Sequence, residues 1–174
     1  MALSSFSQDI SKLNWDKHID GLVNNHRIVP TKKNTYLSLK RKISEKTEGV
    51  NFGVLLSGGV DSSIIAKICK DLGKDFRCFC VGIKGSKDIF YAQKVSDYFN
   101  LDLVVKEYSL DEVELLLKEV IDVLPTPSIV EDNYIEYIVK LTVSAVNLGS
   151  MRLGSEKLFL SGIGAEELFA GYER

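Results

Sequence analysis

The sequence predicts an α/β fold in which a doubly wound, mostly parallel sheet carries helices on both faces, preceded by an N-terminal helical segment. Two observations support this fold. From residue 50 onward, short apolar runs alternate with segments whose apolar residues recur every three or four positions. The runs are too continuously apolar for half-exposed strands and are typical of strands buried on both faces. Because strands and helices alternate along the chain, we expect a parallel sheet.

The size and composition of the chain suit a single globular domain. It has 174 residues, of which 45% are hydrophobic and 26% charged, which is enough for a sizeable core. Its 22 basic and 24 acidic residues give a net charge of −2, which offers no general attraction to nucleic acid. No segment approaches the ~20 apolar residues of a membrane span, and the N-terminus lacks the pattern of a secretory signal. We therefore expect a cytoplasmic protein with neither a membrane nor a nucleic-acid partner.

The first 49 residues are more polar than the remainder of the chain. We expect residues 1–34 to form an N-terminal extension and residues 35–174 to form the main domain. Within residues 35–49, Tyr36, Leu39 and Ile43 share roughly one helical face and Gly49 provides a stop, so this stretch predicts a helix. The extension is a candidate oligomerisation element, an interpretation that rests on its polar character alone.

Four apolar runs predict the strands of the sheet, at residues 51–57, 75–82, 101–108 and 156–162. After the first run, Val60, Ile64, Ile68 and Leu72 recur every four residues and predict a helix with one apolar stripe. After the second run, residues 87–100 predict another helix. The apolar face of that helix is predicted to contain Ile89, Tyr91 or Ala92, Val95 and Phe99.

Two further helices are predicted between the third and fourth runs. Ser109 and Glu112 form a capping-box pattern, and Pro125 ends the helix that they begin. Ser128 and Glu131 repeat this spacing before a longer helix. The apolar positions are Val113, Leu116, Leu117, Val120, Ile121 and Leu124 in the first helix, and Tyr134, Ile135, Ile138, Val139 and Val146 in the second.

The three cysteines, Cys69, Cys78 and Cys80, are odd in number and have no CxxC spacing. Cys78 and Cys80 alternate within a predicted strand, so they should share one of its faces. We interpret all three as small core residues in the reducing cytosol and not as a metal or redox site.

Serine and glycine follow two of the predicted strands, in the stretches VLLSGG (residues 54–59) and LFLSGIG (residues 158–164). Open α/β sheets bind ligands at the carboxyl ends of their strands. Glycine lets backbone N–H groups approach phosphate oxygens, and the following helix adds partial positive charge at its N-terminus. The two stretches therefore predict a phosphate-binding site.

Neither of the two common phosphate-binding motifs is present in these stretches. A Walker A loop requires a Lys where this chain has Gly59, and a dinucleotide fingerprint requires a third Gly where it has Glu167.

Asp61 adds a carboxylate to the first of these loops. A carboxylate beside a phosphate repels bare polyphosphate unless a divalent cation lies between them, and Mg²⁺ is the ion expected there. The second loop supplies Glu166 and Glu167, so Asp61 and Glu166 are predicted to face one metal–pyrophosphate site. The alternative is that these acids only complement the N-termini of their helices. The presence of both loops favours the metal.

The first loop, S-G-G-V-D-S-S at residues 57–63, resembles the pyrophosphate loop of the N-type ATP pyrophosphatases. The second, F-L-S-G-I-G-A-E-E-L-F-A-G-Y at residues 159–172, resembles the corresponding segment in the synthetase domain of asparagine synthetases. Residues 85–99 also resemble that family, and the resemblance extends from about residue 35 to the end of the chain. It implies a fold like that of the adenine nucleotide alpha hydrolases.

The resemblance also implies an ATP-dependent, AMP-forming amidoligase. A small substrate carboxylate would attack the α-phosphorus of ATP, giving an acyl-adenylate and pyrophosphate, and ammonia would then displace AMP. Asp61 and Glu166 would serve the catalysis as ligands of Mg²⁺. The residues implied to hold pyrophosphate are Ser57, Gly58, Gly59, Ser62 and Ser63. The residues implied to line the adenosine pocket are Leu55 or Leu56, Val81, Gly82, Ser161 and Gly162.

Three departures from the family pattern leave the product open. Ile163 stands where asparagine synthetases carry a Glu that serves the chemistry on the bound substrate, and an isoleucine cannot accept a proton. Glu166 replaces the usual Asp. The chain begins without the N-terminal cysteine nucleophile that releases ammonia from glutamine, and it ends at Arg174, where family members continue. We therefore expect either a compact nucleotide-binding module or an acceptor site that a homo-oligomer or a partner chain completes.

Two other functions stay open at this point. One is a tRNA-modifying enzyme that adenylates a base before sulfur transfer, which the balanced charge, the lack of CxxC pairs and the second loop disfavour. The other is a non-catalytic regulatory module that binds ATP or AMP. Ile163 and the short C-terminus favour this second alternative.

Overall fold

The computed structural model describes residues 31–124 and 134–165 of the chain. The chain divides into two compact units between Ser38 and Leu39. Helix α2 (Lys32–Lys46) crosses this division, and the sheet lies entirely within the second unit. The predicted boundary between residues 34 and 35 stays a prediction, as does an oligomeric role for the N-terminal extension.

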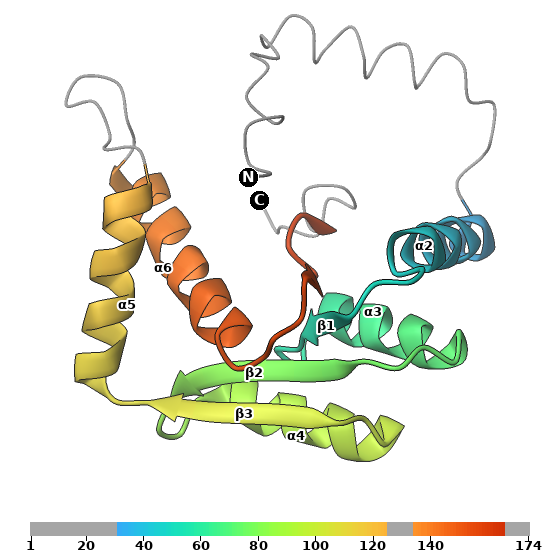
Figure 1. The fold of residues 1–174 in the computed structure, drawn as a ribbon, viewed down its shortest axis with the longest axis horizontal. Helices are drawn as coiled ribbons and strands as arrows, with labels where there is room; N and C mark the ends of the chain where they lie inside the picture. The colour runs from blue at the N-terminus through green and yellow to red at the C-terminus, as the bar shows by residue number, and fades with distance from the viewer. Residues whose placement is uncertain (1–30, 125–133, 166–174) are drawn as a thin grey trace, which may run out of the picture. The chain divides into compact units, whose positions relative to one another are not determined.

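Four parallel strands form the sheet, in the order β3-β2-β1-β4 (Figure 1). Their bounds are Phe52–Leu55 for β1, Arg77–Ile83 for β2, Leu103–Tyr108 for β3 and Leu158–Leu160 for β4. The chain places β2 and then β3 on one side of β1 and afterwards returns to place β4 on the other side. This reversal of strand order between β1 and β4 confirms the predicted doubly wound parallel sheet.

Helices cover both faces of the sheet, as the sequence predicted. Helices α3 (Val60–Asp71) and α4 (Lys87–Phe99) lie on one face (Figure 1). Helix α6 (Tyr134–Met151) lies on the other face, packed beside α5 (Leu110–Val123). Within the part of the chain that the structure describes, no helix is both long enough and apolar enough to cross a membrane.

The main core lies between the sheet and helices α3 and α4. Alternate strand residues point into it, including Val54 of β1 and Cys78 and Cys80 of β2. Ile43 of α2 is buried against the same core. The predicted common orientation of Cys78 and Cys80 is therefore confirmed.

The cysteines behave as core residues. Cys69, Cys78 and Cys80 are all buried and form no disulfide. Burial raises the pKa of Cys69 and of Cys78 to about 12 and that of Cys80 to about 11. The thiols are neutral at physiological pH, so none of them presents the thiolate that metal binding or redox chemistry requires.

The apolar stripe predicted for α3 is partly wrong. Ile68 is buried as expected, but Val60 and Ile64 are exposed. The buried face instead contains the small residues Ser62 and Ala66. Small side chains at these two positions let this part of the helix lie close to the sheet, and the larger Ile68 is buried further along the helix.

The capping box predicted at the start of α5 is confirmed. The Ser109 hydroxyl oxygen accepts a hydrogen bond from the Glu112 N–H (3.2 Å), and the Glu112 carboxylate accepts one from the Ser109 N–H (2.8 Å). The second predicted box, at Ser128 and Glu131, lies outside the described residues, as does Pro125.

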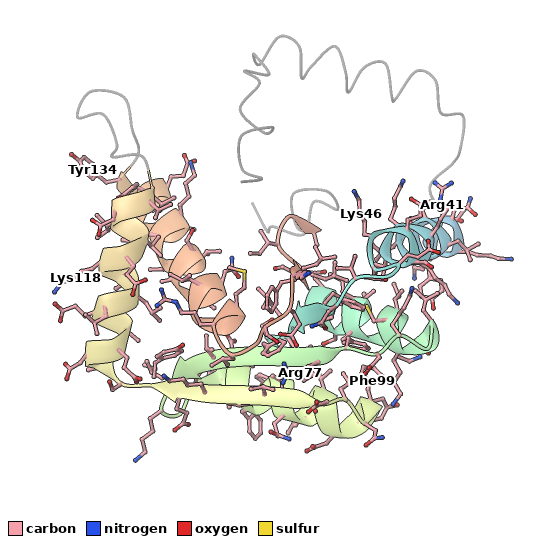
Figure 2. The ribbon with its side chains drawn as sticks, viewed as in Figure 1. Arg41, Lys46, Arg77, Phe99, Lys118 and Tyr134 are labelled. Carbon is pink, nitrogen blue, oxygen red and sulfur yellow. The ribbon has the colours of Figure 1, made fainter. Side chains whose placement is uncertain are left out.

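Helix α6 turns its smallest side chains inward. Its buried residues are Ala145, Gly149 and Ser150, and the Tyr108 hydroxyl donates a hydrogen bond to the Gly149 carbonyl (3.1 Å). Tyr134 lies at the end of the helix that is farthest from the sheet (Figure 2). The periodicity thus located the helix but not its buried face. The residues that carried this periodicity, Tyr134, Ile135, Ile138, Val139 and Val146, are exposed.

An ion pair joins the beginning of β2 to the segment that leads into β4, with a guanidinium that is 42% exposed and a carboxylate that is buried. The Glu156 side chain is 3% exposed, and its Oε1 accepts hydrogen bonds from Nε (2.9 Å) and Nη2 (2.7 Å) of Arg77 (labelled in Figure 2). The Arg77 guanidinium also lies 5.3 Å from the centroid of the Phe79 ring. Glu156 Oε2 is buried without a hydrogen-bond partner among the described residues. The compensation of this buried charge therefore depends on Arg77.

Replacing Arg77 with methionine should destabilise the protein strongly. The change leaves the Glu156 carboxylate buried without a counter-charge, which costs on the order of 3 kcal/mol in the free energy of unfolding. The matched control is Arg152→Met, because Arg152 pairs with Glu119 where both side chains are 47% exposed. Loss of such a surface pair costs at most ~1 kcal/mol. Urea unfolding measures both variants, and equal losses would contradict the importance of the buried pair.

The raised cysteine pKa values give a second expected result. Folded protein at pH 8 should not react with the thiol reagent DTNB, whereas all three cysteines should react in denaturant. The unfolded chain releases thiol protons near pH 9, but the folded chain retains them until about pH 11 to 12. The thiol contribution to the free energy of unfolding should therefore fall as the pH rises through this window. Rapid labelling of folded protein at pH 8 would show that the thiols are accessible and ionised.

Candidate functional site

Two loops meet where the strand order reverses. Strands β1 and β4 are paired in parallel, with Gly53 opposite Phe159 and Val54 opposite Leu160. The loops that follow these strands therefore leave the sheet at the same edge. Open α/β sheets bind their ligands at such a switch point.

The loop after β1 is ordered by its own serine hydroxyls. Ser57 Oγ accepts a hydrogen bond from the Gly59 N–H (3.3 Å) and lies 3.1 Å from Ser62 Oγ. Ser62 Oγ also accepts from the Ser57 N–H (3.3 Å), and Ser63 Oγ donates to the Gly59 carbonyl (2.6 Å). These bonds fix the loop at the beginning of α3, with Ser57 and Gly59 exposed.

The loop after β4 repeats this local geometry. Ser161 Oγ accepts a hydrogen bond from the Ile163 N–H (3.2 Å), with the same two-residue spacing as the bond from Gly59 to Ser57. Each loop also contains a glycine with a positive φ, 80° at Gly58 and 89° at Gly164. The sequence similarity of the two loops thus corresponds to a similarity in structure.

Gly162 brings the two loops into direct contact. A Cβ added at Gly162 would lie 2.9 Å from the Asp61 Cβ and 2.9 Å from the Ser62 backbone nitrogen. Both distances are too short for a real Cβ, so only glycine permits this approach. The contact places the first turn of α3 against the loop after β4.

Two other glycines of the predicted site serve close packing. A Cβ at Gly58 would lie 2.4 Å from the Tyr91 carbonyl carbon, and a Cβ at Gly82 would lie 2.6 Å from the Ser86 side chain. Gly58 therefore lets its loop pack on α4, and Gly82 allows the tight turn that leads into α4. Neither glycine lines the cavity described next.

A cavity of about 520 Å³ opens beside the two loops. The predicted site residues that line it are Leu55, Leu56, Ser57, Gly59, Asp61, Ser62, Val81, Ser161 and Gly162. Gly58, Ser63 and Gly82 are close to these residues in the chain but outside the lining. Glu166, the second predicted metal ligand, lies outside the described residues, as does Glu167.

The sequence reasoning missed the opposite wall of the cavity. Helix α6 supplies Thr142, Val143, Val146, Asn147 and Ser150, while Phe79 and Cys80 come from β2 and Asp88 from α4. One indication was available in the sequence. Asn147 and Ser150 are polar residues three positions apart in a helix whose other positions are mostly apolar, and polar residues at this spacing share one helix face.

The charge in the cavity is negative. Asp61 and Asp88 are the charged side chains among the described lining residues. Asp61 is half-buried in the first turn of α3, and no described residue forms an ion pair with it. This arrangement disfavours a bare anion and favours a cation that accompanies one.

The donor atoms fit Mg²⁺ only as part of a larger ligand set. Within the described ranges, no three metal-binding side chains form a group. Mg²⁺ commonly uses one or two carboxylates and completes its shell with phosphate oxygens and water. The Asp61 carboxylate beside the Ser57 and Ser62 hydroxyls is compatible with that mode of binding and not with a cage made of protein ligands alone.

Comparison with known proteins gives a consistent family match. Residues 39–174 match the family model described as asparagine synthase. A glutamine-hydrolysing asparagine synthetase of Zea mays is 31% identical over 143 residues, which are 76% of this chain and 23% of the relative. Glutamine-hydrolysing asparagine synthetase 2 of Oryza sativa subsp. japonica is 32% identical over 133 residues, 71% of this chain and 22% of the relative. The chain thus spans less than a quarter of the length of these curated relatives.

Two solved structures share the fold. The NH3-dependent NAD synthetase of Campylobacter jejuni has a TM-score of 0.54 at 18% identity, over 83% of this chain and 62% of that one. The NMN synthetase of Francisella tularensis has a TM-score of 0.50 at 16% identity, over 72% of this chain and 49% of that one. At these identities the likeness concerns the fold alone.

Gly58→Ala should destabilise the protein more than Gly73→Ala. Both glycines have a positive φ, 80° and 64°, so either alanine costs about 1–2 kcal/mol of backbone strain. Only at Gly58 does the added Cβ meet backbone atoms of α4, since nothing lies within 4 Å at Gly73. We expect Gly58→Ala to lower the free energy of unfolding by at least ~3 kcal/mol in urea titrations. Equal losses in the two variants would show that the loop does not need its contact with α4.

Proposed function

The chain belongs to the asparagine synthase family, as its two loops predicted, and we propose that its cavity binds ATP with Mg²⁺ and activates a carboxylate before amide formation. The observation that carries this proposal is the contact between the two loops at Gly162. It joins a carboxylate, serine hydroxyls and a helix N-terminus beside one cavity. These are the groups that a metal-bound polyphosphate requires.

The loop after β1 is proposed to hold the β- and γ-phosphates, which leave as pyrophosphate. Hydroxyls of Ser57, Ser62 and Ser63 can donate to phosphate oxygens, and the N-terminus of α3, a helix of 12 residues, adds partial positive charge. Gly58 and Gly59 contribute backbone N–H groups in this proposal. The hydrogen bond between the Ser57 and Ser62 hydroxyls would be exchanged for bonds to the ligand.

The strand ends are proposed to hold the adenosine. Leu55, Leu56 and Val81 offer apolar contacts to an adenine ring. Backbone groups along Ser161–Gly162 line the cavity and supply polar contacts to the sugar or the base in this proposal. Gly82 is included because it directly follows the lining residue Val81. Apolar walls with a few polar groups are typical of nucleotide and cofactor sites.

Asp61 and Glu166 are the proposed ligands of Mg²⁺, of which Asp61 belongs to the described residues. Bound Mg²⁺ would supply charge compensation for the polyphosphate and for the departing pyrophosphate. Asp61 would hold the ion against the loop after β1, and the close approach at Gly162 keeps the carboxylate at the cavity.

The proposed reaction has two steps. A carboxylate oxygen of a small acceptor bonds to the α-phosphorus, the bond to the oxygen that bridges to the β-phosphate breaks, and pyrophosphate leaves. Ammonia then attacks the acyl carbon, and AMP leaves with the electron pair of the acyl–oxygen bond. The residues of this chain would bind and orient ATP for the first step, with the acceptor site within this chain or completed by a second copy or a partner chain.

Asp61→Asn should abolish the effect of Mg²⁺ on ATP binding. Calorimetric titration with ATP, with and without Mg²⁺, should show wild-type affinity that rises with Mg²⁺ by about tenfold or more, a difference worth about 1.4 kcal/mol. The variant should show no such rise. Asp111→Asn is the matched control because Asp111 also stands in the first turn of a helix, α5. Equal behaviour of both variants would mean that Asp61 only complements its helix.

Product analysis separates the proposal from its alternatives. AMP and pyrophosphate formed from ATP only when a carboxylate is present would support the ligase, and dependence of amide formation on ammonia would identify the second step. ATP binding without turnover for any carboxylate would instead support a regulatory module, which Ile163 favours. A tRNA substrate is disfavoured because no lysine or arginine is found among the described residues of the cavity.

A further inference from the structure

The cavity is lined in part by apolar side chains that the fold leaves exposed. Val143 and Val146 on α6 are 40% and 52% exposed, and Ile163 in the loop after β4 is 61% exposed. All three line the cavity, and we call them the apolar wall. Exposed apolar surface is unfavourable in water, and apolar side chains that line a cavity are typical of ligand sites. The apolar wall therefore suits an apolar part of a ligand.

The described lining of the cavity contains no lysine or arginine that could pair with an additional acidic group on that ligand. Asp61 and Asp88 are the charged residues of the described lining. With Asp61 occupied by the proposed Mg²⁺, a carboxylate that the ligand retains would face Asp88 and would find no lysine or arginine partner among the described lining residues. After adenylation of its side-chain carboxylate, aspartate would retain an α-ammonium and an α-carboxylate, and both would lose hydration against the apolar wall. An acid with a single carboxylate and an apolar skeleton retains no such charged group.

The apolar wall lies beside the proposed phosphate site. Ile163 follows Gly162, which contacts the first turn of α3 at Asp61 and Ser62. The hydrogen bond from the Ile163 N–H to Ser161 Oγ holds this turn in place. Ile163 and the proposed phosphate-binding residues Ser57 and Ser62 therefore line the same cavity.

We propose that the acceptor is a monocarboxylic acid with an apolar carbon skeleton, and that Val143, Val146 and Ile163 select it over a dicarboxylic acid such as aspartate. This inference rests on the proposed ATP site. The carboxylate oxygen of the acid bonds to the α-phosphorus, the bond from that phosphorus to the bridging oxygen breaks, and pyrophosphate leaves with the electron pair. The apolar skeleton then lies against the wall while the adenylate remains bound.

Stable analogues of the acyl-adenylate test this selectivity without requiring turnover. The probes are adenosine 5′-sulfamates that carry either a hexanoyl or an aspartyl group, and ATP and AMP report on the nucleotide site alone. Calorimetric titration of the full chain should show the hexanoyl probe binding at least about tenfold more tightly than the aspartyl probe. Equal binding of the two probes, or tighter binding of the aspartyl probe, would overturn the inference.

Substitutions in the wall test which residues produce the selectivity. Val146→Thr replaces a methyl group by a hydroxyl of similar size, and Ile163→Asn makes the other side of the wall polar. Each should weaken the hexanoyl probe by about three- to tenfold while leaving AMP affinity unchanged. Val139→Thr is the matched control, because Val139 lies on the same helix with the same 52% exposure but outside the cavity.

The outcomes distinguish the inference from the proposal on which it rests. Failure of ATP and AMP to bind would refute the ATP site and would remove the inference with it. If ATP binds but the hexanoyl and aspartyl probes bind equally well, the ATP site is retained and the inference of an apolar acceptor is overturned. Equal weakening by Val139→Thr and Val146→Thr would also overturn it, because the effect would then not come from the wall.

Discussion

The register between β1 and β4 is the constraint on which the rest of the site depends. With Gly53 opposite Phe159 and Val54 opposite Leu160, both strands reach their carboxyl ends at the same edge, and their serine–glycine loops start side by side. Gly162 can then approach the first turn of α3 to within contact distance. A register shift of one residue would turn the short β4 over, sending its core-facing side chains to the other face. It would also separate Gly162 from Asp61, and the cavity would lose the boundary that the two loops share.

Much of this arrangement could be predicted from the sequence because local chemistry decides it. Continuous apolar runs identified the four strands, and the Ser109–Glu112 pair identified the start of α5 through two hydrogen bonds between residues three positions apart. The meeting of the loops followed from one further step. Parallel strands end at a common edge, so two similar loops that follow buried strands are brought together when the strands are neighbours. The adjacency of β1 and β4 itself is a property of the topology and is not encoded in either loop.

The sequence did not predict which faces of α3 and α6 are buried, because apolar periodicity counts large side chains while close packing favours small ones. On α6, Ala145 and Gly149 enter the core and the larger Val139 and Val146 do not. The same limitation applies to Gly58. Its place in a phosphate loop suggests ligand contact, and the geometry adds a steric requirement set by the Tyr91 backbone of another helix. Contacts between segments 33 residues apart, as from residue 58 to residue 91, leave no mark on local periodicity.

The packing of α6 and the chemistry of the cavity are therefore linked. Because Ala145 and Gly149 lie four positions apart on one buried face and fix the orientation of the helix, the residue that directly follows Ala145 is rotated by about 100° to another face. Val146 is turned toward the cavity as a geometric consequence of burying the small residues, and its apolar character is not required by the core. The fold thus determines where the side chain at position 146 points but does not determine its residue type. Such a position can adapt to a ligand. The residue type found there, like that of Ile163 across the cavity, is then information about the ligand and not about folding.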